Sequence, residues 1–323
     1  MAPVLSRSKP VRHTGFDMQL AVENVRVEAD DVVILTLVRP NGGDLAGWVP
    51  GAHLDVFTPS GRQRHYSLNG DPTDRTSYRI AIRRMGDGGG GSLEMHDVKA
   101  GDLVHVRGPR NAFNLIAAPS YLFVAGGIGV TPILPMVKAA AVGSADWKMV
   151  YLGRSRGSMP FLDELSALPG GHVEIRPDDE FGLPDVVEIL AMAEPGAAIY
   201  MCGPSPMHET ARRVMADINP TGSLHSERFS PPVIVDGHGF AVTLQKTGKT
   251  IEVAADESAL TAIRRELPYV AYSCQQGFCG TCKVRVLAGT VEHHDRILLP
   301  AEHDDSMMIC VSRSTGDSLV LDL

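Results

Sequence analysis

The sequence lacks any long, uninterrupted hydrophobic run. Its most apolar stretch, residues 121–142, is broken by glycines, prolines and Lys138, whereas a membrane-spanning helix needs about 20 consecutive apolar residues. The first 15 residues contain no apolar segment of the kind that a secretory signal requires. We therefore expect no membrane span and a cytoplasmic location.

The sequence is also poor in cysteine and has no excess of positive charge. The 323 residues include five cysteines, which argues against a disulfide framework in such a long chain. A formal net charge of −8 argues against non-specific binding to nucleic acid, whose phosphates attract basic surfaces. The length exceeds that of one ordinary core and predicts two or three domains of roughly 100–150 residues each.

Most of the cysteines that are present cluster near the C-terminus with a recognisable spacing. Three follow the pattern C-x4-C-x2-C and a fourth lies further on: Cys274, Cys279, Cys282 and Cys310. This is the spacing of plant-type [2Fe–2S] ferredoxins, in which one loop supplies three thiolates and a distant element the fourth. Gly277 and Gly280 allow the backbone to wrap closely around a cluster. The alternative is a structural zinc site, but zinc ribbons usually pair two C-x2-C knuckles.

The residues around these cysteines predict a small mixed domain. Phe240–Leu244 and Thr250–Val253 alternate like the strands of a hairpin, and a helical stretch follows from Ser258 to Arg265. Strands are expected again at residues 283–287 and 318–321. From about residue 236 to the end, the chain resembles the plant-type ferredoxin domain, a β-grasp fold. Its excess of acidic residues could steer a basic partner surface or serve solubility alone.

The middle of the chain contains a glycine-rich turn between an apolar strand, residues 121–125, and an apolar helical pattern. The turn reads Gly126-Gly127-Ile128-Gly129-Val130-Thr131-Pro132. Thr131 suits the N-cap position and Pro132 the first position of the helix. A helix N-terminus behind such glycines favours a bound pyrophosphate. By itself, the motif could equally be an ordinary strand-to-helix turn.

Two further strands, residues 148–152 and 198–201, end in polar or glycine-containing motifs: Gly153-Arg154-Ser155-Arg156 and Cys202-Gly203-Pro204. The alternation of strand and helix predicts a parallel sheet, whose ligands bind at the carboxyl ends of the strands. Arg154 and Arg156 could contact a nucleotide phosphate or ribose, or water alone.

This set of motifs resembles the NAD(P) domain of the ferredoxin reductase superfamily. The resemblance implies NADH more than NADPH, and it implies that a first group of residues holds the pyrophosphate: Gly126, Gly127, Gly129, Thr131 and Pro132. A second group would lie near the nicotinamide: Cys202, Gly203 and Pro204. Cys202 could instead be a small buried core residue.

The N-terminal third shows regularly spaced short strands, which predict an antiparallel barrel. One strand carries Arg64-His65-Tyr66-Ser67-Leu68, whose cation, aromatic ring and hydroxyl suit a flavin phosphate, ribityl chain and ring edge, although an ordinary strand could contain the same residues. Gly90-Gly91-Ser92 precede a short helical segment, residues 93–98, and could form a phosphate nest or a flexible loop.

Taken together, these barrel motifs resemble the flavin-binding motifs of the same superfamily. The order of the parts is similar to the family of phthalate dioxygenase reductase and vanillate O-demethylase reductase. The resemblance implies FMN rather than FAD, with Ser67 near flavin N5 and Phe229 covering the ring. Phe229 could otherwise be a core residue. The expected parts are a flavin barrel at 17–116, a nucleotide-binding α/β domain at 117–229, a linker at 230–235 and a β-grasp ferredoxin domain at 236–323.

The resemblance also implies an electron path. Hydride would pass from NADH to FMN, framed by Ser67, Thr131, Cys202 and Phe229, and single electrons would pass through the cluster to a Rieske-type oxygenase. A cytochrome P450 as the acceptor is one alternative. A redox-sensing binding module is an alternative of another class. We expect a monomer, and no metal site among the histidines, with His293 and His294 on the surface.

Overall fold

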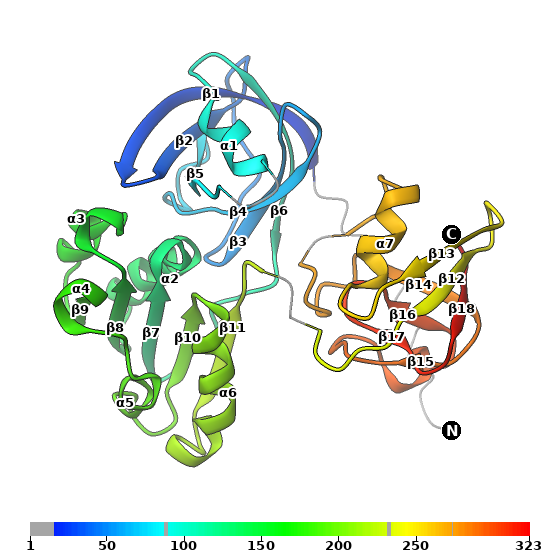
Figure 1. The fold of residues 1–323 in the computed structure, drawn as a ribbon. Coiled ribbons are helices and arrows are strands. Elements are labelled where there is room, and N and C mark those ends of the chain that lie inside the picture. The colour runs from blue at the N-terminus through cyan, green and yellow to red at the C-terminus, as the bar shows by residue number, and fades with distance from the viewer. Residues whose placement is uncertain (1–15, 87–89, 231–233, 273) are drawn as a thin grey trace, which may run out of the picture. The chain divides into compact units, whose positions relative to one another are not determined.

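The computed structural model describes residues 16–86, 90–230, 234–272 and 274–323 (Figure 1). The chain divides into two compact units with the boundary between Phe229 and Ser230. The expected linker lies partly outside the described residues, at 231–233. Within the described residues, no helix is both long and apolar enough to cross a membrane.

Six antiparallel strands open the first unit and pair in the order β4-β3-β6-β1-β2-β5. Their bounds are β1 (Phe16–Ala29), β2 (Val32–Val38), β3 (Ala52–Phe57), β4 (Gln63–Ser67), β5 (Ser77–Arg83) and β6 (Leu103–Asn111). A bridge between Leu68 and Ile80 joins the two edges, so the sheet closes into the predicted barrel. Alternate aliphatic residues such as Leu54 and Val56 fill its interior, as the period of two along a strand requires. The helix α1 (Gly91–His96) follows β5.

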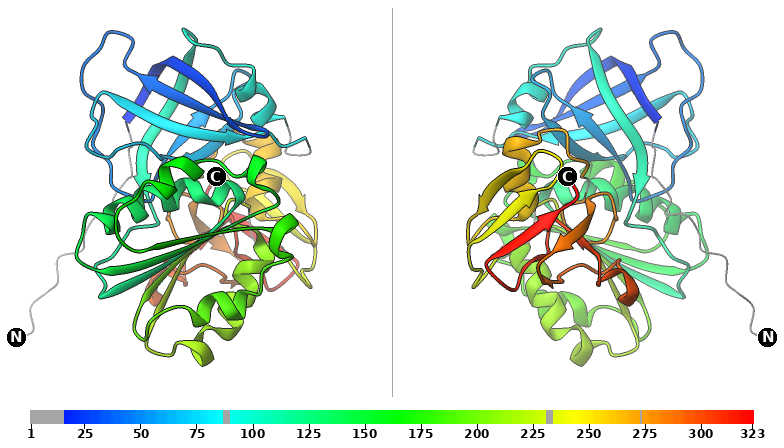
Figure 2. Two further views of the ribbon diagram at one scale, coloured as in Figure 1. Left: turned by 90° about the vertical axis from the view of Figure 1, so that its left-hand side faces the viewer. Right: turned by 90° about the vertical axis from the view of Figure 1, so that its right-hand side faces the viewer.

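A five-stranded parallel sheet completes the first unit, in the order β11-β10-β7-β8-β9. Its strands are β7 (Ser120–Gly126), β8 (Asp146–Gly153), β9 (His172–Pro177), β10 (Ala198–Cys202) and β11 (Ser223–Glu227). The connecting helices are η1 (Gly127–Gly129), α2 (Val130–Ala141), η2 (Arg156–Ser158), α3 (Leu162–Ser166), α4 (Asp178–Phe181), α5 (Val186–Ala191) and α6 (Ser205–Ile218). The apolar residues of α2 pack on one face, and those of α5 and α6 on the other (Figure 2). Both faces are therefore covered, as all-parallel sheets require.

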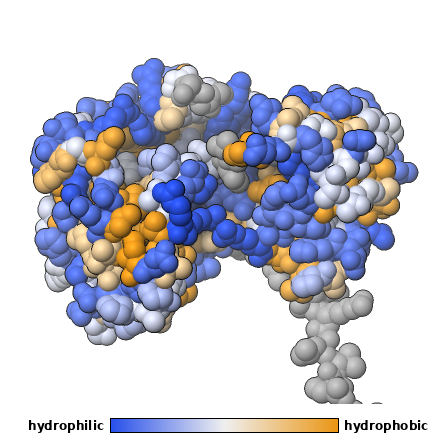
Figure 3. All heavy atoms as spheres, turned by 60° about the horizontal axis from the view of Figure 1, so that its bottom comes forward, coloured by the Kyte–Doolittle hydropathy of each residue, from blue (hydrophilic) through white to orange (hydrophobic). Residues whose placement is uncertain are grey.

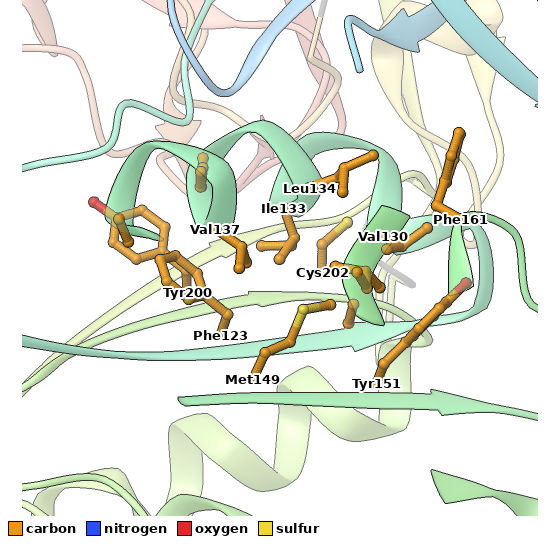
Figure 4. Packing of buried hydrophobic residues seen from close by; sticks show 14 of the residues in the cluster. Phe123, Val130, Ile133, Leu134, Val137, Met149, Tyr151, Phe161, Tyr200 and Cys202 are labelled. Carbon is orange, nitrogen blue, oxygen red and sulfur yellow. The ribbon is translucent and has the colours of Figure 1, made fainter. Parts of the chain in front are cut away.

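The barrel and the parallel sheet share one hydrophobic core. Val32, Ile34 and Ala81 of the barrel belong to the same buried cluster as α2 and the strands β7, β8 and β10. Figure 4 shows this cluster between α2 and the sheet, with Ile133, Val137 and Phe123 facing one another. Continuous packing of this kind holds the carboxyl ends of the parallel strands in a set position against the barrel.

The second unit contains a mixed five-stranded sheet in the order β13-β12-β18-β14-β16. The bounds are β12 (Phe240–Leu244), β13 (Lys249–Val253), α7 (Ala259–Glu266), β14 (Lys283–Ala288), β15 (Val291–Glu292), η3 (Pro300–Glu302), β16 (Ser306–Met308), β17 (Arg313–Ser314) and β18 (Ser318–Leu321). The predicted hairpin is present as β12 and β13, and β18 runs parallel to β12. Leu260 and Ile263 of α7 pack on this sheet, which gives the expected β-grasp arrangement.

The surface is largely polar. On the face drawn in Figure 3, hydrophilic side chains cover most of the area, and hydrophobic ones gather in a few patches between them. Some exposed apolar area of this kind is normal in folded proteins.

Candidate functional site

The four C-terminal cysteines converge in two pairs. The side chain of Cys274 contacts that of Cys279 through a hydrogen bond, and Cys282 contacts Cys310 in the same way. A [2Fe–2S] rhomb takes two thiolates on each iron, so a two-plus-two arrangement of sulfurs suits it. Cys282 and Cys310 are buried and the other two are partly exposed. The donor set therefore fits the predicted cluster.

The loop backbone around Cys274 and Cys279 also suits a cluster. Amide groups point at the sulfurs, including that of Gln276, which lies 3.4 Å from the Sγ of Cys274. Gly277 has a φ of +77°, and a Cβ atom there would come within 2.7 Å of Val311. Only glycine meets both conditions. Amides directed at sulfur stabilise the extra negative charge of a reduced cluster.

The two predicted flavin motifs lie together at one end of the barrel. Arg64 on β4 lies against the first turn of α1, where a Cβ atom on Gly91 would be 2.6 Å from the Arg64 Nε. The Ser92 hydroxyl accepts a hydrogen bond from the Met85 amide at 3.0 Å, which ties the loop back on itself. Gly90 has a φ of +81°, a conformation that glycine adopts without strain. The arrangement places a guanidinium beside a glycine-rich turn, and such a pair can hold a phosphate.

The other residues of this motif differ in their surroundings. Tyr66 pairs with Leu54 and packs against the barrel core, where burial raises the pKa of its hydroxyl to about 12. Ser67 is buried opposite His53. Leu68 is completely buried in the core and its amide donates to the carbonyl of Ala52. The Leu68 side chain therefore belongs to the barrel core, and the expectation that this residue binds the cofactor stays a prediction.

His65 belongs to a buried charged cluster that the sequence did not reveal. Its ring lies 3.1 Å from the fully buried Asp55 carboxylate, which also pairs with Arg110 at 2.9 Å. Burial alone would raise the pKa of Asp55, but the His65 hydrogen bond and the nearby cations outweigh it and lower that pKa. Burial also lowers the pKa of the neighbouring His53 to about 4. The cluster joins β3, β4 and β6, and His65 contributes to it from between Arg64 and Tyr66 on β4.

The two glycine motifs of the parallel sheet meet at the carboxyl ends of neighbouring strands. Cys202 pairs with Ala125, so the turn after β7 lies beside the turn after β10. A Cβ atom on Gly129 would lie 2.3 Å from the Cys202 carbonyl oxygen, and one on Gly126 would lie 2.7 Å from Pro204. Close backbone approach explains these glycines without any ligand. Gly126, Gly127 and Gly203 are nevertheless partly exposed at the edge where parallel sheets bind nucleotides.

Thr131 and Pro132 do not occupy the predicted capping positions. The turn of η1 runs directly into α2, which begins at Val130 with Gly129 as the N-cap. Thr131 is buried in the first turn, and its hydroxyl donates to the carbonyl of Ile128 at 2.9 Å. The expectation of a Thr131 N-cap was wrong because the glycines start the helical turn earlier. The expectation that Thr131 and Pro132 contact pyrophosphate stays a prediction.

Cys202 belongs to the buried cluster that the barrel shares with the parallel sheet, and it has no exposed area. Figure 4 shows its sulfur below α2, next to Ile133 and Val130. Burial raises the pKa of this thiol well above its ordinary value, so it is a neutral packing group. Its enclosed side chain matches the alternative interpretation of a core cysteine, and the expectation that Cys202 lies near the nicotinamide stays a prediction.

Glu227 is a buried acid that the sequence analysis missed. It ends β11 directly beside Cys202, and burial raises its pKa to about 8. Its Oε2 atom has no hydrogen-bond partner among the described residues. Two positions later, Phe229 is half exposed rather than in the core. A Ser-Glu-Arg-Phe ending offered no signal of this burial, because it depends on strands β10 and β11 being neighbours.

Arg154 and Arg156 differ in their surroundings. Arg156 forms a two-point ion pair with Glu180, with distances of 2.7 and 2.9 Å. Arg154 is exposed and forms no ion pair with any described residue. Both follow β8, close to the edge where the glycine motifs meet.

Comparison with known proteins agrees with this arrangement. Residues 242–315 match the family model of the 2Fe-2S iron-sulfur cluster binding domain. The chain is 37% identical to the phthalate 4,5-dioxygenase oxygenase reductase subunit of Pseudomonas putida, over 91% of this chain and 93% of that protein.

Solved structures are similar as well. The structure of phthalate dioxygenase reductase, described as modular for electron transfer from pyridine nucleotides to [2Fe-2S], matches with a TM-score of 0.71 and 34% identity, covering 95% of this chain and 98% of that one. Full-length CYP116B46 from Tepidiphilus thermophilus matches with a TM-score of 0.72 and 37% identity, covering 98% of this chain but 44% of that one.

Proposed function

Because the chain belongs to the phthalate dioxygenase reductase family, we propose that it takes hydride from NADH onto FMN and delivers single electrons through a [2Fe–2S] cluster to a Rieske-type oxygenase. Membership makes it an NAD(P)H-dependent flavin and iron–sulfur oxidoreductase, a reductase subunit of an oxygenase system. The finer assignments of nucleotide, flavin and acceptor are the proposal. The observation that carries it is the presence, in one chain, of a flavin motif, a nucleotide edge and four converging cysteines.

In this proposal the flavin phosphate binds between Arg64 and the turn formed by Gly90, Gly91 and Ser92. The contact between Arg64 and Gly91 supports this, because the guanidinium already lies over the turn that would supply amide donors. Tyr66 would pack beside the isoalloxazine, and Ser67 would hydrogen-bond near N5. A bound flavin would accept two electrons together and release them singly, which links a hydride donor to a one-electron cluster.

The nicotinamide nucleotide would bind at the carboxyl edge of the parallel sheet. Gly126, Gly127 and Gly129 would face the pyrophosphate, and Phe229 would cover the flavin until the nicotinamide replaces it. The half-exposed ring of Phe229 supports such movement. Cys202 and Gly203 would act through backbone position, since the thiol is enclosed.

The preference for NADH rests on Glu180. Its carboxylate occupies one edge of the Arg156 guanidinium, the Nε and Nη2 donors, so a 2′-phosphate at that edge would compete with it and meet like-charge repulsion. We expect Glu180→Gln to free Arg156 and to raise the ratio of kcat/KM for NADPH over NADH about tenfold. Steady-state assays with an artificial acceptor measure this ratio. Glu194→Gln, which removes a pair with Lys148, should leave it unchanged.

A cytochrome P450 is the second candidate acceptor. The similarity to full-length CYP116B46 supports it, since that longer chain includes a region of this fold. Reconstitution with a Rieske oxygenase and with a P450 separates the two by product yield per NADH.

The decisive test is an anaerobic titration of the purified protein with NADH, followed by its visible spectrum. The expected result is bleaching of flavin and cluster bands together, with a capacity near three electrons per chain, two on the flavin and one on the cluster. Reduction by NADPH or dithionite alone would overturn the NADH assignment. Failure to oxidise either nucleotide with any acceptor would favour a redox-sensing module instead.

A further inference from the structure

His293 and Asp295 stand in the ferredoxin unit with the separation of two ligands to one metal ion. The Nδ1 atom of His293 lies 3.4 Å from the Oδ1 atom of Asp295. Two ligand atoms about 2.0–2.2 Å from a tetrahedral ion are about 3.3–3.6 Å apart. A strong hydrogen bond between charged groups would be shorter, about 2.7–2.9 Å. The spacing therefore suits a shared cation better than a direct bond.

Further hydrogen bonds of His293 and Asp295 orient the two side chains for metal binding. The Nε2 atom of His293 lies 3.2 Å from the carbonyl oxygen of His303, and a histidine that binds metal through one nitrogen commonly donates from the other to such an acceptor. Asp295 uses its Oδ2 atom to accept from the amides of Ile297 and Leu298, at 3.3 and 2.9 Å. Its Oδ1 atom faces the His293 ring and also accepts a hydrogen bond from the Ser312 hydroxyl at 3.4 Å.

A third ligand stands beside them. The rings of His303 and His293 are stacked with centroids 3.9 Å apart, and one ligand atom from each of the three residues lies within 4.8 Å of the others. His303 is exposed, so its ring can rotate toward the pair at little cost. We propose that His293, Asp295 and His303 bind one divalent transition metal, with zinc as the best match, leaving a fourth position for water.

The site adjoins the loop that carries the cluster ligands but does not use them. The Arg296 amide donates to the carbonyl of Gly277 at 2.9 Å, so the proposed ion would lie near the loop of Cys274, Cys279 and Cys282. Its nitrogen and carboxylate ligands are different residues from the four thiolates, so zinc could bind here while the cysteines hold the cluster. The proposal departs from the expectation that the histidines offer no metal site. The partly buried His293 differs from its exposed neighbour His294.

The test is calorimetric titration of zinc chloride into untagged holoprotein whose cluster absorbance is recorded throughout. We expect saturation at one zinc per chain with the cluster spectrum unchanged. His293→Ala and His303→Ala should each weaken binding at least ~tenfold. His294→Ala is the matched control, because His294 pairs with Glu292 and lies outside the cluster, and it should bind zinc like the unaltered protein.

His303→Ala keeps the test informative even if His293→Ala destabilises the loop, because an exposed side chain contributes little to folding. Absence of saturable binding would overturn the proposal. Equal affinity in the unaltered protein and His303→Ala would do so as well. Loss of cluster absorbance during binding would show that zinc displaces iron at the cysteines, and this too would overturn it.

Discussion

At the scale of single residues, several glycines let a neighbouring carbonyl, cation or side chain lie close to the backbone. Gly91 admits the Arg64 guanidinium, Gly129 admits a carbonyl, and Gly277 admits the side chain of Val311. Each position is occupied by the one residue without a Cβ atom. Substitutions there should therefore affect the sites more than their small size suggests.

Gly91→Ala should weaken flavin binding at least ~tenfold, because the new methyl group would displace the guanidinium proposed to hold the phosphate. Fluorescence titration of the flavin-free protein with FMN measures the dissociation constant. Gly86→Ala is the control in the same loop, since a Cβ atom there meets no atom within 4 Å. Equal losses in both variants would point to loop stiffness and contradict the phosphate assignment.

Glu227 should make the stability of the protein depend on pH. Its carboxyl pKa is raised by burial from 4.5 to about 8, so in this window the folded state holds a proton that the unfolded state releases. The free energy of unfolding should therefore fall as pH rises from about 4.5 to about 8, by roughly 5 kcal/mol at most.

Glu227→Gln should remove this contribution, as measured by urea unfolding at several pH values. Glu188→Gln, at an exposed position, should retain the slope. An unchanged slope in Glu227→Gln would show that the buried carboxyl is ionised in the folded state.

At the scale of elements, the cluster loop contains three residues with positive φ within six positions. It combines a residue other than glycine at positive φ, Gln275, with Gly277 and Gly280 at φ values of +77°. The neighbouring loop packs against it through Arg296 and Asp295. Cluster assembly should therefore require this backbone path as well as the four thiolates.

Gly277→Ala should reduce cluster content severalfold, because its Cβ atom would clash with Val311 at 2.7 Å and its φ would become strained. The ratio of visible to ultraviolet absorbance, with iron analysis, measures the content. Gly316→Ala, in the same unit with no atom within 4 Å of the added group, should assemble normally. Full cluster occupancy in Gly277→Ala would refute the argument.

At the scale of the whole molecule, the barrel and the parallel sheet act as one body. Glu164 on α3 forms ion pairs with Arg79 on β5 and with Lys138 on α2. The Phe161 amide donates to Glu28 at 3.0 Å, and Phe161 lies under the Arg79 guanidinium. These contacts join the barrel to the helices of the parallel sheet beside the shared apolar core, and we expect them to help align the proposed flavin and nucleotide sites.

Glu164→Ala should lower the free energy of unfolding by about 1–2 kcal/mol, since it leaves two partly exposed cations without their partner. It should also slow hydride transfer severalfold in stopped-flow experiments, because the two sites lose alignment. Glu266→Ala removes an exposed pair with Lys249 and should change neither quantity. Normal hydride transfer in a destabilised Glu164→Ala protein would limit the network to a structural role.

The sequence by itself determined the parts and their chemistry. Cysteine spacing predicted the cluster, strand periodicity predicted the barrel and the hairpin of β12 and β13, and the glycine turns marked the carboxyl ends of β7 and β10. These signals are local, because ligand spacing, turns and the period of two are properties of neighbouring residues.

Only the tertiary structure decided which residues meet. It buried Cys202 beside Glu227, placed Arg64 on Gly91, paired Arg156 with Glu180 and brought His303 to His293. These pairs join segments whose proximity depends on strand order and loop packing. Burial and the pKa of a buried group follow from that proximity, so no pattern along the chain encodes them.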